Sequence, residues 1–149
     1  MSPYFRRLLP LLVFLAGGYW LAMFVLTHVP SVELPDINYI DKVYHAAGYA
    51  VLAFALSGVF TLWRGYDQRM LLLVWIVVAT YAAIDEYTQQ FVLNRSSDKF
   101  DFLADIVGAA LGLLGLLACL RLSSRCEAVV PSDKVAHNKV AAEAWSVRN

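Results

Sequence analysis

Four apolar stretches, each long enough to cross a bilayer as a helix, occupy most of this 149-residue chain. They cover roughly residues 8–27, 43–63, 70–92 and 102–120. A membrane-spanning helix needs about 20 mostly apolar residues, and a hydrophobic content of 60% excludes an ordinary soluble domain. The sequence therefore predicts an all-α integral membrane bundle of four transmembrane helices, which short loops join as antiparallel neighbours.

The distribution of basic residues predicts how this bundle is oriented. Lys and Arg residues lie before the first stretch, between the second and third, and after the fourth: Arg6, Arg7, Arg64, Arg69, Arg121, Arg125, Lys134 and Lys139. The loop at 28–42 instead carries three acidic residues and one lysine. Because cytoplasmic loops are enriched in Lys and Arg, we expect both termini to be cytoplasmic and the loops at 28–42 and 93–101 to face outward.

The chain divides by composition into two parts. Residues 1–122 form the predicted membrane domain, and residues 123–149 are a polar cytoplasmic tail that we interpret as flexible. An alternative is a short amphipathic helix on the inner leaflet around Val135, Val140 and Trp145. The net charge of zero disfavours nucleic acid as a partner.

Three of the four stretches contain ionisable side chains near the ends predicted to face outward. These residues are His45, Asp85, Glu86 and Asp105. A charged side chain at the centre of a membrane helix costs about 2.5–3.5 kcal/mol to insert, and less near the interface. A proton, a basic partner or a metal ion must offset this cost, and such residues usually mark a functional site.

Helix geometry places further polar side chains on the same faces, because residues three or four apart are neighbours on a helix surface. The sets with this spacing are Asp41, His45 and Tyr49 in the second helix, Glu86, Gln89 and Gln90 in the third, and Asp98, Asp101 and Asp105 in the fourth. We expect these polar faces to converge on one shallow pocket that opens outward.

Structural roles are the alternative for several of these groups. Asp41 and Asp101 lie where a carboxylate caps the start of a helix. His45 could be a hydrogen-bonded packing residue. Arg95 could form a salt bridge with Glu86 or Asp101, in which case no metal ion is needed.

The charge balance at the outer end favours a cation over a bare phosphate. Six carboxylates face three basic side chains there: Asp41, Asp85, Glu86, Asp98, Asp101 and Asp105 against Lys42, Arg95 and Lys99. One imidazole with several carboxylates can bind Mg²⁺, Mn²⁺, Ca²⁺ or Zn²⁺. A divalent metal ion is therefore the candidate cofactor, and its candidate ligands are His45, Glu86, Asp101 and Asp105.

Small residues predict close packing of the fourth helix. Gly108, Gly112 and Gly115 follow the pattern that lets membrane helices approach one another. The face that carries Gly108 and Gly112 continues at steps of three and four residues through Asp105 and Asp101. The close contact should therefore lead directly into the polar pocket.

This ordered set of residues resembles the VanZ-like family of small bacterial membrane proteins. The matching elements, which span residues 41–112, are Asp41-Lys42-x2-His45, Tyr49, Glu86-x2-Gln89, Arg95-x-Ser97, Asp101 and Gly108-x3-Gly112. The family takes its name from a teicoplanin-resistance protein, and the resemblance implies a multi-pass protein of the bacterial inner membrane. The family pattern usually has Asn where this chain has Asp105.

Two functions fit these residues. The first is recognition of an envelope lipid or a lipid-linked cell-wall precursor through its headgroup. The candidate headgroup contacts are Lys42, Tyr49, Gln89, Arg95 and Ser97, with His45 beside them. The second is a membrane-embedded hydrolase or transferase that acts on a lipid-linked substrate, with or without a bound metal ion. Its catalytic candidates are His45, Glu86 and Asp101.

Two further interpretations rank lower. A transporter would need more than four helices, and thus a homo-oligomer, and the sequence shows no inverted repeat. A purely structural membrane scaffold would use all of these charges in helix caps and salt bridges.

Overall fold

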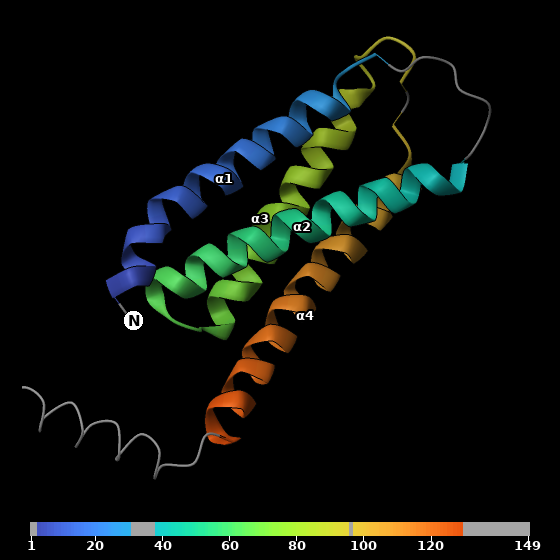
Figure 1. Ribbon diagram of the computed structural model, residues 1–149. Coiled ribbons are helices and arrows are strands. Elements are labelled where there is room, and N and C mark those ends of the chain that lie inside the picture. The colour runs from blue at the N-terminus through green and yellow to red at the C-terminus, as the bar shows by residue number, and fades with distance from the viewer. Residues whose placement is uncertain (1–2, 31–37, 96, 130–149) are drawn as a thin grey trace, which may run out of the picture. The chain divides into compact units, whose positions relative to one another are not determined.

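The computed structural model describes residues 3–30, 38–95 and 97–129, and it contains four helices in that part of the chain. They are α1 (Pro3–Thr27), α2 (Asn38–Arg64), α3 (Gln68–Gln89) and α4 (Lys99–Val129), shown in Figure 1. All four are long and apolar enough to cross a membrane, and no strand occurs among the described residues. The predicted all-α class with four helices long and apolar enough to span a membrane is confirmed, whereas the orientation of the termini stays a prediction.

Each helix begins two to five residues before its predicted range, and the C-terminal ends of α3 and α4 differ most from the prediction. α3 ends at Gln89, three residues before the predicted limit, because the chain turns at Gln90–Asn94. α4 continues to Val129, so the first part of the predicted tail is helical. The rest of that tail, with its three proposed amphipathic positions, lies outside the described residues, as do residues 31–37 of the loop at 28–42.

Short connections set the direction of successive helices. Only Gly65–Asp67 separates α2 from α3. Gly65 has a φ of +86°, a left-handed conformation that glycine adopts without strain. Asp67 then caps α3 by accepting a hydrogen bond from the backbone N–H of Arg69 at 2.9 Å.

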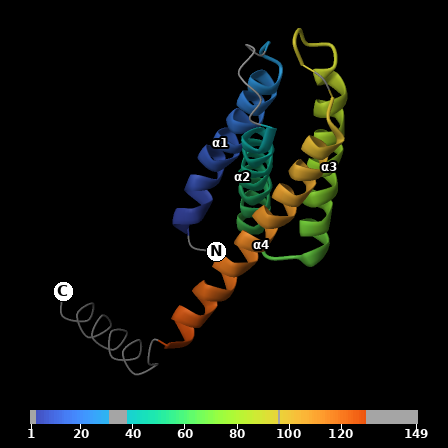
Figure 2. The same ribbon diagram turned by 90° about the vertical axis from the view of Figure 1, so that its right-hand side faces the viewer.

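The chain packs as two units, residues 1–116 and residues 117–149. In the first unit consecutive helices run antiparallel, and α2 lies between α1 and α3 (Figure 2). The ends of α1 and α3 therefore lie with the starts of α2 and α4. We call this end of the first unit the polar end.

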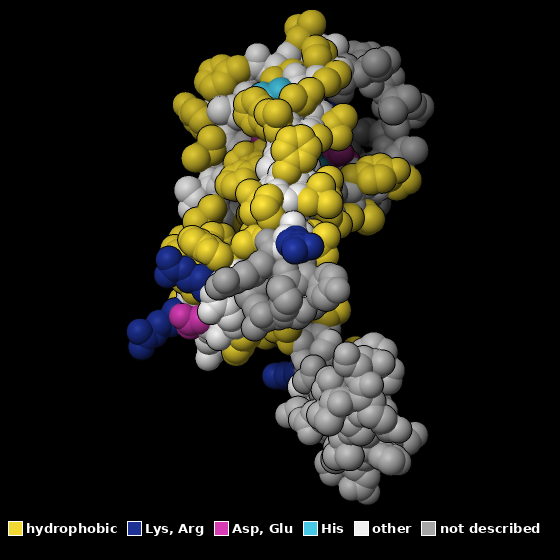
Figure 3. Space-filling model, turned by 60° about the vertical axis from the view of Figure 1, so that its left-hand side comes forward, with side chains coloured by type: hydrophobic (Ala, Val, Ile, Leu, Met, Phe, Trp, Pro, Cys, Tyr) yellow, Lys and Arg dark blue, Asp and Glu magenta, His cyan; other side chains and the backbone are white. Residues whose placement is uncertain are grey.

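The apolar core of the first unit forms around α2. Its buried members are Met23 of α1, Tyr49, Leu52 and Ala53 of α2, Val74, Val78 and Ala82 of α3, and Ala109 of α4. Most other apolar side chains point outward. On the face in Figure 3 they cover most of the described surface above a group of Lys and Arg side chains. An apolar exterior of this kind suits a bilayer rather than water.

Two glycines bring α4 directly onto the backbone of α2. A Cβ atom added to Gly108 would lie 2.1 Å from the carbonyl oxygen of Ala46, and one added to Gly112 would lie 2.1 Å from that of Ala50. Gly115 differs, because a Cβ there would meet only the Phe54 side chain at 3.6 Å. The predicted close approach is confirmed at Gly108 and Gly112, and it holds the polar ends of α2 and α4 together.

Candidate functional site at the polar end

Polar side chains from all four helices meet at the polar end in two groups. The first, which we call the His45 cluster, comprises Asp41, His45, Glu86, Asp101 and Asp105. The second, which we call the Asp85 network, comprises Thr27, His28, Tyr49, Tyr81, Asp85 and Gln89. Tyr49 lies one turn from His45 on α2 and so connects the two groups.

The centre of the His45 cluster is a buried contact among three helices. His45 Nδ1 of α2 lies 3.0 Å from Asp105 Oδ1 of α4. Glu86 of α3 completes a group in which one ligand atom from each residue lies within 4.8 Å of the others. His45, Glu86 and Asp105 are only 8%, 5% and 1% exposed. The structure therefore brings together three of the four residues predicted as metal ligands.

The fourth predicted ligand belongs to the more exposed side of the cluster. Asp101 groups with Asp41 and His45 within the same 4.8 Å limit, but Asp41 is exposed. Asp101 also pairs with Lys42, whose Nζ lies 2.8 Å from Asp101 Oδ1 and 2.9 Å from Asp98 Oδ2. Asp101 and Asp98 thus share the positive charge of one lysine.

Asp98 holds this side of the cluster in place. Its carboxylate accepts hydrogen bonds from the backbone N–H of Phe100 at 2.9 Å and from Lys42. These two donors, the backbone one first, lower the pKa of the Asp98 carboxyl below its usual value. Its own backbone N–H donates to Glu86 Oε1 at 2.5 Å, so the start of α4 also fixes the orientation of Glu86.

Two oxygens of the cluster lack a partner among the described residues. Glu86 Oε2 and Asp105 Oδ2 are buried and accept no hydrogen bond from that part of the chain. Buried polar atoms are normally satisfied, and each exception needs an explanation. The pair therefore points to a group that the described residues do not supply.

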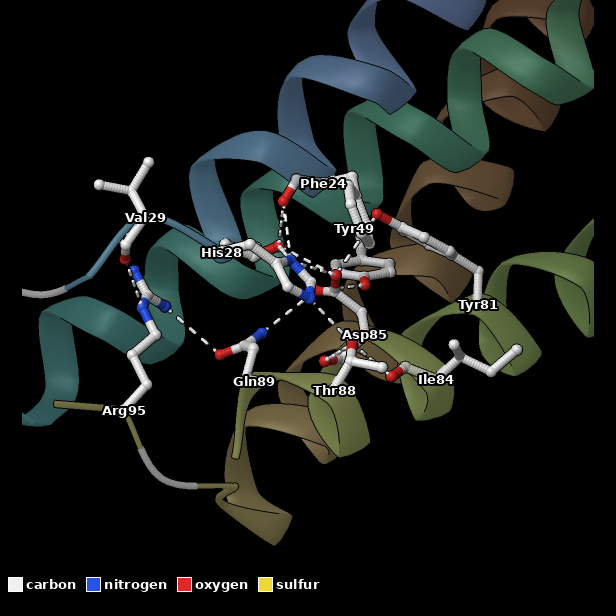
Figure 4. A network of polar contacts seen from close by, with 11 residues as sticks. Phe24, His28, Val29, Tyr49, Tyr81, Ile84, Asp85, Thr88, Gln89 and Arg95 are labelled. Atoms are coloured by element: carbon white, nitrogen blue, oxygen red, sulfur yellow. Dashed lines mark hydrogen bonds and ion pairs between the residues drawn. The ribbon is translucent and has the colours of Figure 1, made fainter. Parts of the chain in front are cut away.

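Asp85 is surrounded very differently, as Figure 4 shows. Its Oδ1 accepts a hydrogen bond from Thr27 at 2.9 Å, and its Oδ2 accepts from Gln89 Nε2 at 3.1 Å and Tyr49 at 3.3 Å. The Tyr81 hydroxyl approaches Oδ1 at 3.5 Å. Asp85 is 1% exposed, and both of its oxygens have partners. It therefore acts as an internal tie between α1, α2 and α3.

The contribution of α1 is absent from the sequence-based prediction, which placed the site on the second, third and fourth helices. His28, just after α1, has Nδ1 2.8 Å from the Phe24 carbonyl and 3.7 Å from Asp85 Oδ1, while Nε2 lies 2.9 Å from the Thr88 hydroxyl. Thr27 and His28 show no helical spacing with other polar residues. The one signal in the sequence that could have placed Thr27 and His28 in the site is that the first apolar segment ends there, on the side of the membrane predicted for the acidic residues.

A cavity of about 340 Å³ opens beside both groups. Its apolar wall comes from α1, with Ala22, Met23 and Leu26. Its polar lining is made by Tyr19, Thr27, Asp41, Tyr44, His45, Tyr49 and Arg95. The volume is typical of small-ligand pockets, which are mostly apolar with a few polar groups. The cavity also gives a possible ligand direct contact with His45.

The remaining predicted contacts are distributed around this cavity. Arg95 donates to the Val29 carbonyl at 3.2 Å and to Gln89 Oε1 at 3.3 Å (Figure 4). Among the described carboxylates, none pairs with Arg95, so the proposed salt bridge to Glu86 or Asp101 is not formed. Gln89 is buried between Arg95 and Asp85, and Ser97 is exposed.

Comparison with protein families matches residues 9–121 to the VanZ/LLP1 family. The chain belongs to the VanZ/LLP1 family. The match covers α2 and α3 completely, most of α1 and α4, and every residue of the His45 cluster and the Asp85 network. It confirms the resemblance to the VanZ-like family, and together with the four apolar helices it makes the chain a VanZ/LLP1-family membrane protein. Neither the curated proteins nor the solved structures contain a match to this chain.

Proposed function

We propose that this protein recognises the anionic headgroup of an envelope lipid or a lipid-linked cell-wall precursor. The observation that carries the proposal is the cavity of about 340 Å³, whose lining changes from apolar on α1 to polar at Arg95, His45 and Tyr49. An amphiphile has the same two-part character. Its chain would lie against Met23 and Leu26, and its headgroup would reach the polar end.

Arg95 is the proposed anchor for the headgroup. A guanidinium offers five N–H donors in a planar fork that matches a phosphate or carboxylate. The described partners of Arg95 are a backbone carbonyl and a side-chain amide oxygen, both of them neutral. Lys42 was a second candidate anchor, but it is paired with Asp98 and Asp101 and does not line the cavity.

Lipid retention by the purified full-length protein tests this function. The probes are phosphatidylglycerol and phosphatidylcholine, and native mass spectrometry counts the lipid that stays bound after detergent exchange. We expect Arg95→Gln to weaken phosphatidylglycerol binding about tenfold, since one charge-assisted contact contributes about that factor. Arg64→Gln is the matched control, because Arg64 is exposed at the other end of α2.

A second pair of variants tests the cavity itself. Ala22→Phe fills the apolar wall and should reduce retention of both lipids, whereas Ala83→Phe, at an exposed site on α3 outside the cavity lining, should change neither. Equal retention of both lipids by the wild type, Arg95→Gln and Ala22→Phe would rule out headgroup recognition in this cavity.

A second candidate function is hydrolysis or transfer of a lipid-linked group. The observation that favours it is that His45 both lines the cavity and contacts the buried acids. In this proposal Glu86 is the general base, His45 transfers protons, and Asp101 orients the His45 side chain. Turnover that survives both Glu86→Gln and His45→Ala would exclude this chemistry.

A further inference from the structure

We propose that His45, Glu86 and Asp105 form a binding site for a single divalent transition-metal ion. The site does not depend on the proposed lipid function. It follows from the positions of three buried side chains and from two oxygens without partners. One donor comes from each of α2, α3 and α4, so the ion would join three helices at the polar end.

The composition of the group matches such an ion. Two carboxylates carry two negative charges, and a neutral imidazole adds a nitrogen donor. Among the described salt bridges, Asp105 pairs only with His45, and Glu86 pairs with no basic side chain. Lys42 Nζ is already bound by Asp98 and Asp101. A divalent cation would therefore balance carboxylate charges that no described lysine or arginine pairs with.

The geometry is close to that of a formed site. Two ligands about 2.1 Å from the same ion lie about 3.0–3.4 Å apart, and His45 Nδ1 and Asp105 Oδ1 are separated by 3.0 Å. One donor atom of each residue lies within 4.8 Å of the other two, so the group would contract around a bound ion. Glu86 Oε2 and Asp105 Oδ2 supply buried lone pairs that no described donor uses.

The surroundings hold these ligands in place. The backbone N–H of Asp98 fixes Glu86 through its other carboxylate oxygen. Gly108 lies three residues after Asp105, and Ala46 directly follows His45, so the close contact of Gly108 with Ala46 fixes α4 against α2 beside these two ligands. Partners that orient a ligand typically change metal affinity by a factor of about 10–100. His45, one of the three proposed ligands, also lines the cavity, so an ion would reach the site from that side.

The donor set selects the class of metal. Mg²⁺ and Ca²⁺ favour oxygen ligands alone, and Mg²⁺ retains several waters. Imidazole suits Zn²⁺ and other transition metals, whereas carboxylates also suit Mn²⁺. A site with one imidazole and two carboxylates is therefore assigned to Zn²⁺ or Mn²⁺. The other three-residue group, with Asp41 and Asp101, is less suited because Asp41 is exposed and Asp101 is paired with Lys42.

Titration of the full-length protein with Mn²⁺ tests the site. The protein is purified in detergent, stripped with EDTA and titrated without added lipid, and the electron paramagnetic resonance signal reports free Mn²⁺. We expect saturable binding of one ion, competed by Zn²⁺ and not by equimolar Mg²⁺. Glu86→Gln and Asp105→Asn keep the side-chain shape, and each should weaken binding at least about tenfold.

Asp67→Asn is the matched control, because Asp67 caps α3 at the opposite end and Asn caps equally well. It should bind Mn²⁺ as the wild type does. Circular dichroism and gel-filtration elution establish that each variant is folded, and Mn²⁺ should raise the unfolding temperature of the wild type and Asp67→Asn alone.

Absence of saturable binding by the wild type, or unchanged binding by both Glu86→Gln and Asp105→Asn, overturns the proposal. An infrared carbonyl band from a protonated carboxylic acid, lost in these two variants, would then assign the unpartnered oxygens to a shared proton. Because the titration contains no added lipid, its failure leaves headgroup recognition standing, and failure of lipid retention leaves the metal site standing.

Discussion

Two adjacent acids on α3 have opposite surroundings. Asp85 is buried and both of its oxygens accept hydrogen bonds, whereas one oxygen of Glu86 is buried without a partner. A buried carboxylate with several donors has its hydrogen-bonding capacity used within the protein. The contacts of Asp85 therefore hold the helices together, whereas Glu86 keeps an oxygen for the binding role proposed above.

The Thr27 hydroxyl provides a specific test of the Asp85 network. It donates to Asp85 Oδ1 at 2.9 Å from a different helix. Thr27→Val removes this donor at nearly constant volume and should reduce the free energy of unfolding by about 1–3 kcal/mol, because hydrogen bonds to charged groups have that magnitude. Unfolding in mixed micelles titrated with sodium dodecyl sulfate provides the measurement.

Thr80→Val is the matched control. The Thr80 hydroxyl donates to Ile76 on its own helix, and the side chain is exposed. We expect its substitution to change stability by less than about 0.5 kcal/mol. Equal losses in the two threonine variants would show that the contact with Asp85 contributes nothing specific.

At the scale of helices, the contact between α2 and α4 determines whether the His45 cluster forms. His45 and Asp105 come from these two helices, and Gly108 lies three residues after Asp105. Backbones can approach this closely only where the interface has no side chain. The glycine face therefore places the two ligands on opposite sides of the same small space.

Gly108→Ala should separate the two helices. The added Cβ would lie 2.1 Å from the Ala46 carbonyl oxygen, and a backbone atom cannot move aside cheaply. We expect a loss of at least about 1–3 kcal/mol in the free energy of unfolding, the usual cost of overpacking, together with loss of Mn²⁺ binding. Thermal unfolding and the Mn²⁺ titration measure the two effects.

Gly115→Ala separates this clash from the general effect of replacing a glycine. Its Cβ would lie 3.6 Å from the Phe54 side chain, an ordinary contact, and alanine is the better helix former. Gly115→Ala should therefore be neutral or stabilising. The interpretation fails if Gly108→Ala is as stable as Gly115→Ala.

At the scale of the whole molecule, the location of the basic residues predicts which side of the membrane holds the polar end. The turn between α2 and α3 is flanked by Arg64 and Arg69, whereas the polar end carries most of the acidic residues. The positive-inside rule then places the polar end outside the cytoplasm. This orientation matters because it decides from which leaflet a headgroup would enter.

Cysteine labelling in sealed membrane vesicles tests the orientation. After replacement of Cys119 and Cys126 by serine, single cysteines are introduced as Leu93→Cys at the polar end and Tyr66→Cys in the opposite turn, both at exposed positions. In right-side-out vesicles an impermeant maleimide should label Leu93→Cys, and Tyr66→Cys should react only after permeabilisation. The reverse pattern would place the polar end in the cytoplasm.

The sequence alone determined the elements of this protein. Apolar length is a local property, so four spanning helices could be predicted without knowledge of their neighbours. The spacing of Gly108 and Gly112 likewise indicated a close helix contact. Because His45, Glu86 and Asp105 each lie near the same end of an apolar segment, the sequence also indicated that they share one polar end.

Only the tertiary structure decided which groups meet there. Successive residues on a helix point about 100° apart, so Asp85 and Glu86 must face different neighbours, but helix periodicity cannot say which ones. Packing directed Asp85 toward Thr27 and Tyr49, and Glu86 toward His45 and the start of α4. The cavity beside α1 also arises from packing alone, because contacts between helices depend on positions that no single segment encodes.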